Sequence, residues 1–97
     1  MAQAINAGYR SEILNEAIDN TTWTPVSFSF NPNNICIRLR EAGDIKVSLD
    51  SLGTTFFTIP NGTSLTYDWN AGRSVDVIYL QASIVAGTAE IIATFEG

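Results

Sequence analysis

Histidine is absent from this chain of 97 residues, and cysteine occurs only once, at Cys36. The lack of histidine excludes a Ser-His-Asp triad and a Cys-His pair, and a single cysteine cannot form an intrachain disulfide. A structural zinc site would need more Cys and His ligands than the chain has. Cys36 alternates with Ile35 and Ile37. We therefore interpret it as an unreactive small side chain that faces away from them.

Charged residues are scarce and mostly acidic. Asp, Glu, Lys and Arg make up 15% of the chain, and five basic against ten acidic residues give a net charge of −5. Nucleic-acid binding needs a basic patch, so we expect no nucleic-acid partner. A surface with few charges is easily buried against a neighbour, which favours an oligomer or a docked subunit. A plain sandwich with threonine-rich outer faces is the alternative.

No apolar run approaches the roughly 20 residues that a membrane span needs. Residues 1–10 show no signal peptide, so we expect synthesis in the cytoplasm and no membrane partner. Asp68 and Asp76 flank a turn and could act as an acid–base pair, but solvated carboxylates near a strand end are the favoured interpretation. Neither a D-x-D-x-D-G calcium loop nor a glycine-rich phosphate loop is present. We therefore expect no enzymatic activity, no catalytic residue, no cofactor and no metal.

From Val26 onward, apolar and polar residues alternate with a period of two, which is typical of strands with one buried face. Turn residues separate these segments at intervals of about ten residues, the rhythm of a sandwich or barrel. The pattern predicts an all-β fold: a small β-sandwich or jelly roll of seven to eight antiparallel strands with an N-terminal arm. We expect residues 41–45 to join two of these strands as a hairpin.

Two segments depart from simple alternation. Residues 75–82 are apolar at four consecutive positions, which indicates a central strand covered on both faces or a face used in an interface. Phe56 and Phe57 point to opposite sides of their strand, so we expect one of the two rings to leave the core.

The first 20 residues have a different pattern. Ile13, Leu14, Ala17 and Ile18 fit one short helical face, but an arm or a first strand is favoured because nothing else in the chain is helical. We therefore divide the chain into an N-terminal arm or first strand, residues 1–20, and a β-sandwich domain, residues 21–97. Trp23, at the junction, is expected to clamp the arm onto the sandwich, with a sugar-stacking platform as the alternative.

The order of features in residues 21–97 is distinctive. Thr22-Trp23-Thr24-Pro25-Val26 opens the domain, residues 56–65 read FFTIPNGTSL, and residues 77–82 read VIYLQA. This pattern resembles small virion structural proteins of tailed bacteriophages, in particular capsid cement or decoration proteins.

The resemblance implies a β-sandwich or jelly roll that self-associates, often as a trimer, and binds across capsomer junctions. The expected partner is the major capsid protein or another virion protein. The expected location is the virion, after synthesis in the host cytoplasm. As a cement protein, each copy would hold two or more neighbouring shell subunits together by non-covalent contacts. A tail, baseplate or head-fibre component and a carbohydrate-binding module are the alternatives.

Such proteins commonly carry an N-terminal arm that orders on the shell. We therefore predict that apolar residues of the arm, together with Trp23, bind the partner: Ile5, Tyr9, Ile13, Leu14, Ile18 and Trp23. Deletion of residues 2–19 would then abolish docking and leave the body folded.

Overall fold

The computed structural model describes residues 9–68 and 76–96, which form eight β-strands and no helix. The strands are β2 (Tyr9–Ile18), β3 (Thr24–Ser27), β4 (Asn34–Leu39), β5 (Ile45–Ser48), β6 (Phe57–Ile59), β7 (Ser64–Asp68), β8 (Val77–Ala82) and β9 (Gly87–Glu96). The all-β prediction is confirmed. Within the described ranges, no helix has the length and apolar character to cross a membrane.

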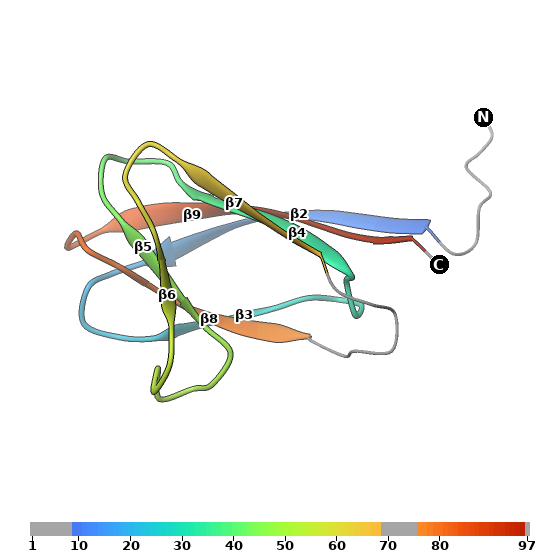
Figure 1. Ribbon diagram of the computed structural model, residues 1–97, viewed down its shortest axis with the longest axis horizontal. Helices are drawn as coiled ribbons and strands as arrows, with labels where there is room; N and C mark the ends of the chain where they lie inside the picture. Colours follow the sequence, from blue (N-terminus) through green and yellow to red (C-terminus); the bar gives the residue numbers. More distant parts are fainter. Residues whose placement is uncertain (1–8, 69–75, 97) are drawn as a thin grey trace.

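The strands form two four-stranded antiparallel sheets that pack face to face as a sandwich (Figure 1). One sheet has the order β2-β9-β4-β7 and the other the order β3-β8-β5-β6. The chain therefore crosses to the other sheet at every step except between β5 and β6, and the first described strand lies beside the last. This strand order is that of a jelly roll.

The prediction of a hairpin at residues 41–45 is wrong. β4 pairs with β7 and β9, whereas β5 pairs with β6 and β8 in the other sheet. The turn residues correctly mark the end of one strand and the start of the next. They do not determine whether the two strands pair, because the same change of direction serves to connect the two layers.

Residues 11–17, for which the sequence left helix, arm and strand open, lie in β2. This strand pairs with β9 along its whole length, from Tyr9 opposite Glu96 to Ile18 opposite Gly87. Leu14 and Ile18 face the interior, whereas Ile13 faces outward and is 69% exposed. The outward Ile13 beside the inward Leu14 is what produced the helix-like spacing.

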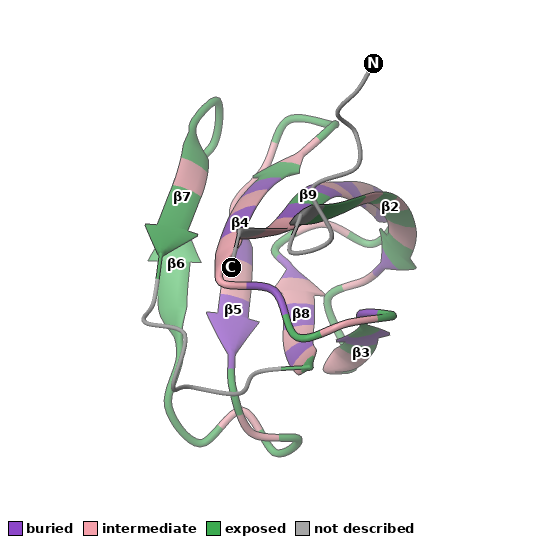
Figure 2. Cartoon of the chain, turned by 90° about the vertical axis from the view of Figure 1, so that its right-hand side faces the viewer, coloured by how far each residue is buried: buried purple, intermediate pink, exposed green. Residues whose placement is uncertain are grey.

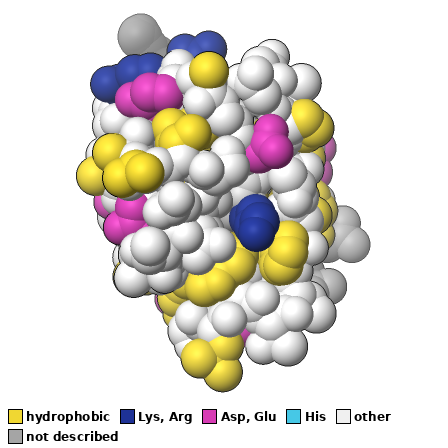
Figure 3. Space-filling model, turned by 90° about the vertical axis from the view of Figure 1, so that its left-hand side faces the viewer, with side chains coloured by type: hydrophobic (Ala, Val, Ile, Leu, Met, Phe, Trp, Pro, Cys, Tyr) yellow, Lys and Arg dark blue, Asp and Glu magenta, His cyan; other side chains and the backbone are white. Residues whose placement is uncertain are grey.

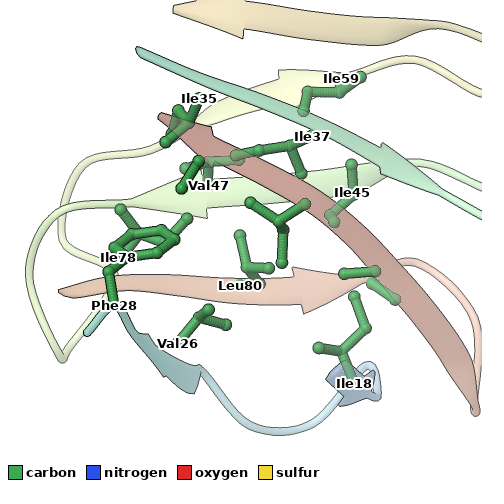
Figure 4. Packing of buried hydrophobic residues seen from close by; sticks show 14 residues of the cluster. Ile18, Val26, Phe28, Ile35, Ile37, Ile45, Val47, Ile59, Ile78 and Leu80 are labelled. Atoms are coloured by element: carbon green, nitrogen blue, oxygen red, sulfur yellow. The ribbon is translucent and has the colours of Figure 1, made fainter. Parts of the chain in front are cut away.

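The core lies between the two sheets and, in the part of the chain that the structure describes, consists of fourteen buried apolar residues (Figure 4). Ile37, Leu80 and Ile91 have no exposed surface at all. Burial of a side chain of this size contributes about 1.5–3 kcal/mol to stability. β8 lies inside its sheet, between β3 and β5, which agrees with the first of the two interpretations of its apolar sequence, a central strand. Its inward residues are buried and its outward residues half-buried.

The turn that joins β2 to β3 is organised by Asp19. Its carboxylate oxygen Oδ1 accepts the backbone N–H groups of Thr21 and Thr22, both at 2.9 Å, and the Thr22 hydroxyl at 2.7 Å. These hydrogen bonds lower the pKa of Asp19 from 3.8 to about 2, and the bond from the Thr21 N–H contributes most to this shift. The ionised carboxylate therefore holds this turn closed.

Acid is expected to weaken this turn. A pKa that is lower in the folded state makes the contribution of Asp19 complete above its ordinary pKa of 3.8 and lost as the pH falls through about 2. Replacing Asp19 with Asn should lower the melting temperature near neutral pH and flatten its decline between about pH 4 and 2. Thermal melts across this range test the prediction, with Asp76→Asn as a control at another exposed aspartate. Equal acid sensitivity of the wild type and Asp19→Asn would contradict it.

Candidate functional site

A groove opens between the two sheets on the side where β6 and β7 form the sheet edges, and it has a volume of about 400 Å³. Its inner wall consists of Ile35, Val47 and Ile78, which belong to β4, β5 and β8 and are buried. Figure 2 shows that β6 and β7, in contrast, are exposed along most of their length. The groove therefore connects the hydrophobic core to the surface.

The strand register explains why the groove is open. Leu65 and Tyr67 lie opposite Ile37 and Ile35, so they face the interior, as their alternation predicted. β7 is the last strand of its sheet, and β6 in the facing sheet has only three residues. Among the described residues, the facing sheet is too short to cover the inner side of β7, and Tyr67 is 48% exposed.

Two phenylalanines form the rim of the groove. The sequence predicted that one of the two rings leaves the core, but Phe56 is 49% and Phe57 is 44% exposed. Leu49, on the same rim, is 60% exposed. Lys46 Nζ lies 4.8 Å from the centre of the Phe56 ring, a cation–π contact that covers this ring from one side.

Trp23 packs against Phe56, which belongs to this rim. Its ring centroid lies 5.8 Å from that of Phe56, with the two planes tilted by 44°. Gly53, which has a φ of +64°, brings the loop so close to the indole that a Cβ at Gly53 would overlap the ring. The half-buried Trp23 therefore packs against the loop that precedes β6, and this contact leaves little of the indole face for a sugar ring.

The chemistry that this groove offers is the burial of apolar groups. Among the described residues, no charged side chain lines it, and the polar ones that do are Thr55 and the phenol of Tyr67. Within the described ranges, no three His, Cys, Asp or Glu residues lie close enough together to hold a metal ion. The groove is therefore suited to an apolar side chain of a partner or to a small apolar molecule.

A second feature lies on the outer face of the β2-β9-β4-β7 sheet. Glu90 accepts from Arg38 Nε at 2.6 Å and from Arg40 Nε at 2.9 Å, and Arg40 also donates to Asn15 at 3.2 Å. The bonds from Arg40 and then Arg38 lower the pKa of Glu90. This cluster could not be predicted from the sequence, because it depends on the pairing of β4 with β9, which are distant in the chain.

The predicted partner-binding residues do not form one surface. Ile18 is 4% exposed in the core and Leu14 packs against it, so neither presents a surface to a partner. Ile13 lies on the outer face, and Trp23 lies behind the groove. Tyr9 begins β2, and Ile5 lies outside the described residues.

No protein-family model and no curated protein matches this sequence. Among solved structures, the fold is similar to that of a crystal structure of Fe(II)-HppE with the alternative substrate (S)-1-HPP. The match has a TM-score of 0.50 and 15% sequence identity, and it covers 91% of this chain and 42% of that chain. At this identity the likeness concerns the fold alone.

This finding contradicts the expectation that the chain is not an enzyme, because the structural neighbour is an Fe(II) enzyme. The expectation rested on missing residue types, and those exclude particular mechanisms rather than catalysis in general. The residues of this chain do not fit an iron centre. Iron sites of the two-histidine, one-carboxylate kind need histidine, which the chain lacks, and no ligand cluster is present in the described residues.

Proposed function

We propose that this protein is a capsid cement protein of a tailed bacteriophage, which binds the major capsid protein through the groove between β6 and β7. The observation that supports this proposal is the apolar groove itself, whose rim presents Phe56, Phe57 and Leu49 to solvent. Exposed apolar patches that lead into a hollow are typical of surfaces that bind another molecule. The apolar side chains of a shell subunit are the partner of matching chemistry.

The fold and the surface also support the proposal. Jelly rolls occur in viral capsid domains, although the fold alone does not determine a function. Few residues of the chain are charged, and Figure 3 shows a face on which hydrophobic side chains form several patches, with a few charged side chains between them. Each copy would contribute a modest contact, and many copies that bind neighbouring subunits would stabilise the shell together.

Replacing Phe57 with Glu should weaken binding to the shell. The charge would be buried with the apolar rim, and the loss of a buried phenylalanine contact of about 1.5–3 kcal/mol corresponds to roughly 10–150-fold in affinity. Co-sedimentation with shells assembled from the phage's major capsid protein measures this effect.

Val85→Glu is the matched control. Val85 is 77% exposed, and it lies in the β8–β9 connection and does not line the groove. Both variants should retain the wild-type circular dichroism spectrum. Unchanged binding by Phe57→Glu would contradict the role of the groove. Wild-type binding to tails and not to heads would instead support a tail or baseplate component.

The volume of the groove favours a second candidate function, the binding of a small apolar molecule. About 400 Å³ lies within the range of small-ligand sites, which are mostly apolar. Thermal melting in the presence of aliphatic and aromatic compounds tests this function. A rise in melting temperature that Phe57→Glu abolishes would support a ligand site, and no rise with any compound would count against it.

A further inference from the structure

β2 is the longest unpaired edge among the described strands. It pairs with β9 on one side, and no other described strand lies along its other side. Such an edge presents a row of free N–H and C=O groups that can pair with another strand. Its ten residues contain neither proline nor lysine, the residues that commonly block edges. The edge strand of the other sheet, β3, has four residues, one of which is Pro25.

We propose that two copies of this chain associate by antiparallel pairing of their β2 edges, which joins the two four-stranded sheets into one continuous sheet. A two-fold axis perpendicular to the sheet relates the copies and keeps both outer faces on the same side. Each residue of β2 must then lie opposite a residue of the other copy that faces the same side of the joined sheet. Residues 11, 13, 15 and 17 of β2 are exposed, whereas residues 12, 14, 16 and 18 are half-buried or buried. Only registers that pair odd with odd and even with even residue numbers are therefore allowed.

The charges of β2 distinguish between the two longest allowed registers. Centring the pair on Ile13 aligns residues 9–17 of both strands and places Arg10 opposite Glu16 of the partner subunit, twice by symmetry. Centring it on Leu14 instead places Glu12 opposite Glu16 of the partner subunit. Opposite charges across a strand pair stabilise it and like charges destabilise it, so the register centred on Ile13 is favoured.

The same register buries the apolar groups that the single chain leaves exposed. Ile13 is 69% exposed and lies opposite Ile92, which is 49% exposed, on the outer face. On the axis, Ile13 of each copy meets its symmetry mate, and a continuous apolar row forms across the joined sheet. Within the described residues of a single chain, neither Arg10 nor Glu16 forms an ion pair. Both are therefore available for the contact between copies.

This pairing does not depend on the proposed function. The groove lies at the opposite edge of the sandwich from β2, because β7 and β2 are the two ends of the same sheet. The paired molecule would therefore carry two open grooves. For a protein that docks on a repetitive shell, two grooves would increase the overall affinity without any new contact.

Light scattering after size exclusion tests the pairing with the full chain. The wild type should have twice the mass of one 10.5 kDa chain. Arg10→Glu and Glu16→Arg should each raise the dissociation constant of the dimer at least tenfold. The double variant Arg10→Glu/Glu16→Arg should restore it to within a few-fold of the wild type, because the swap re-creates the opposite charges.

Circular dichroism and thermal melting confirm that each variant is folded, and Val85→Glu serves as a control that should remain dimeric. A wild type that is monomeric at all concentrations, or trimeric, would overturn the pairing. So would single variants that dimerise like the wild type, or a double variant no better than the singles. Failure of the groove variant to affect shell binding would leave this result untouched, since the two tests use different residues and different readouts.

Discussion

Removing residues 2–19 is expected to unfold the protein, because this segment contains the whole of β2. The deletion removes Ile18 from the core and Leu14 from its border, and it leaves β9 without its neighbour along ten residues. It also removes the carbonyl of Asp19, which accepts the Ala82 N–H at 2.9 Å. Loss of one buried isoleucine alone costs about 2–5 kcal/mol, against a typical domain stability of about 5–15 kcal/mol.

The deletion can be followed by far-UV circular dichroism and urea unfolding. We expect the truncated chain to show no cooperative transition. A matched deletion of residues 2–8, which leaves β2 complete, should retain the transition. A truncated protein that melts cooperatively near the wild-type temperature would show instead that residues 2–19 form a separable arm, as the sequence pattern indicated. Loss of shell binding on deletion of 2–19 would therefore not by itself show docking by this segment.

Replacing Gly53 with Ala is expected to cause the second large effect. Its φ of +64° is unfavourable for a residue with a side chain, at about 1–2 kcal/mol. The new Cβ would also overlap the indole of Trp23, so the ring or the loop must move. Together these effects should lower the free energy of unfolding by about 2–4 kcal/mol. Trp23 contacts Phe56, so the rim of the groove should be disturbed as well.

Gly62→Ala provides the matched control. Gly62 has a similar φ of +80°, but a Cβ there would meet nothing within 4 Å. It should therefore show only the backbone strain of about 1–2 kcal/mol. Denaturant unfolding gives both free energies, and tryptophan fluorescence should change in the Gly53 variant more than in the control. Equal losses for the two variants would contradict the tight packing of Trp23 against Gly53.

Alternation along the chain correctly located the strands whose two faces differ in environment. Ile35 and Ile37 face the core while Cys36 and Arg38 face outward, and the period of two records this difference directly. The apolar stretch of β8 likewise indicated a strand inside a sheet. These features could be predicted because each depends on the immediate environment of one strand.

The strand partners could not be predicted. The sequence contains turn signals at residues 41–45, but whether the chain turns back beside β4 or crosses to the other sheet depends on β9 and β7, which come later in the chain. For the same reason the groove was missed. Leu65 and Tyr67 have the alternation of core residues, and only the short length of β6 leaves them partly uncovered.

Part of the candidate site did have a signal in the sequence. Phe56 and Phe57 stand side by side, so one ring was expected to leave the core, whereas both are exposed at the rim of the groove. The charge-poor composition pointed to association but not to a surface. The alternating residues of β2 contain both the inward Leu14 and the outward Ile13. Only the pairing with β9 shows which of them a partner could reach.

Electron cryomicroscopy of phage particles, with the bound chain located in the map, tests the proposed cement function. If the proposal is correct, copies of the jelly roll lie on the outer shell, with β6 and the loop before it against the major capsid protein and Phe57 buried in that contact. Particles in which the chain is absent, or in which the edge formed by β6 and β7 faces solvent, would contradict it.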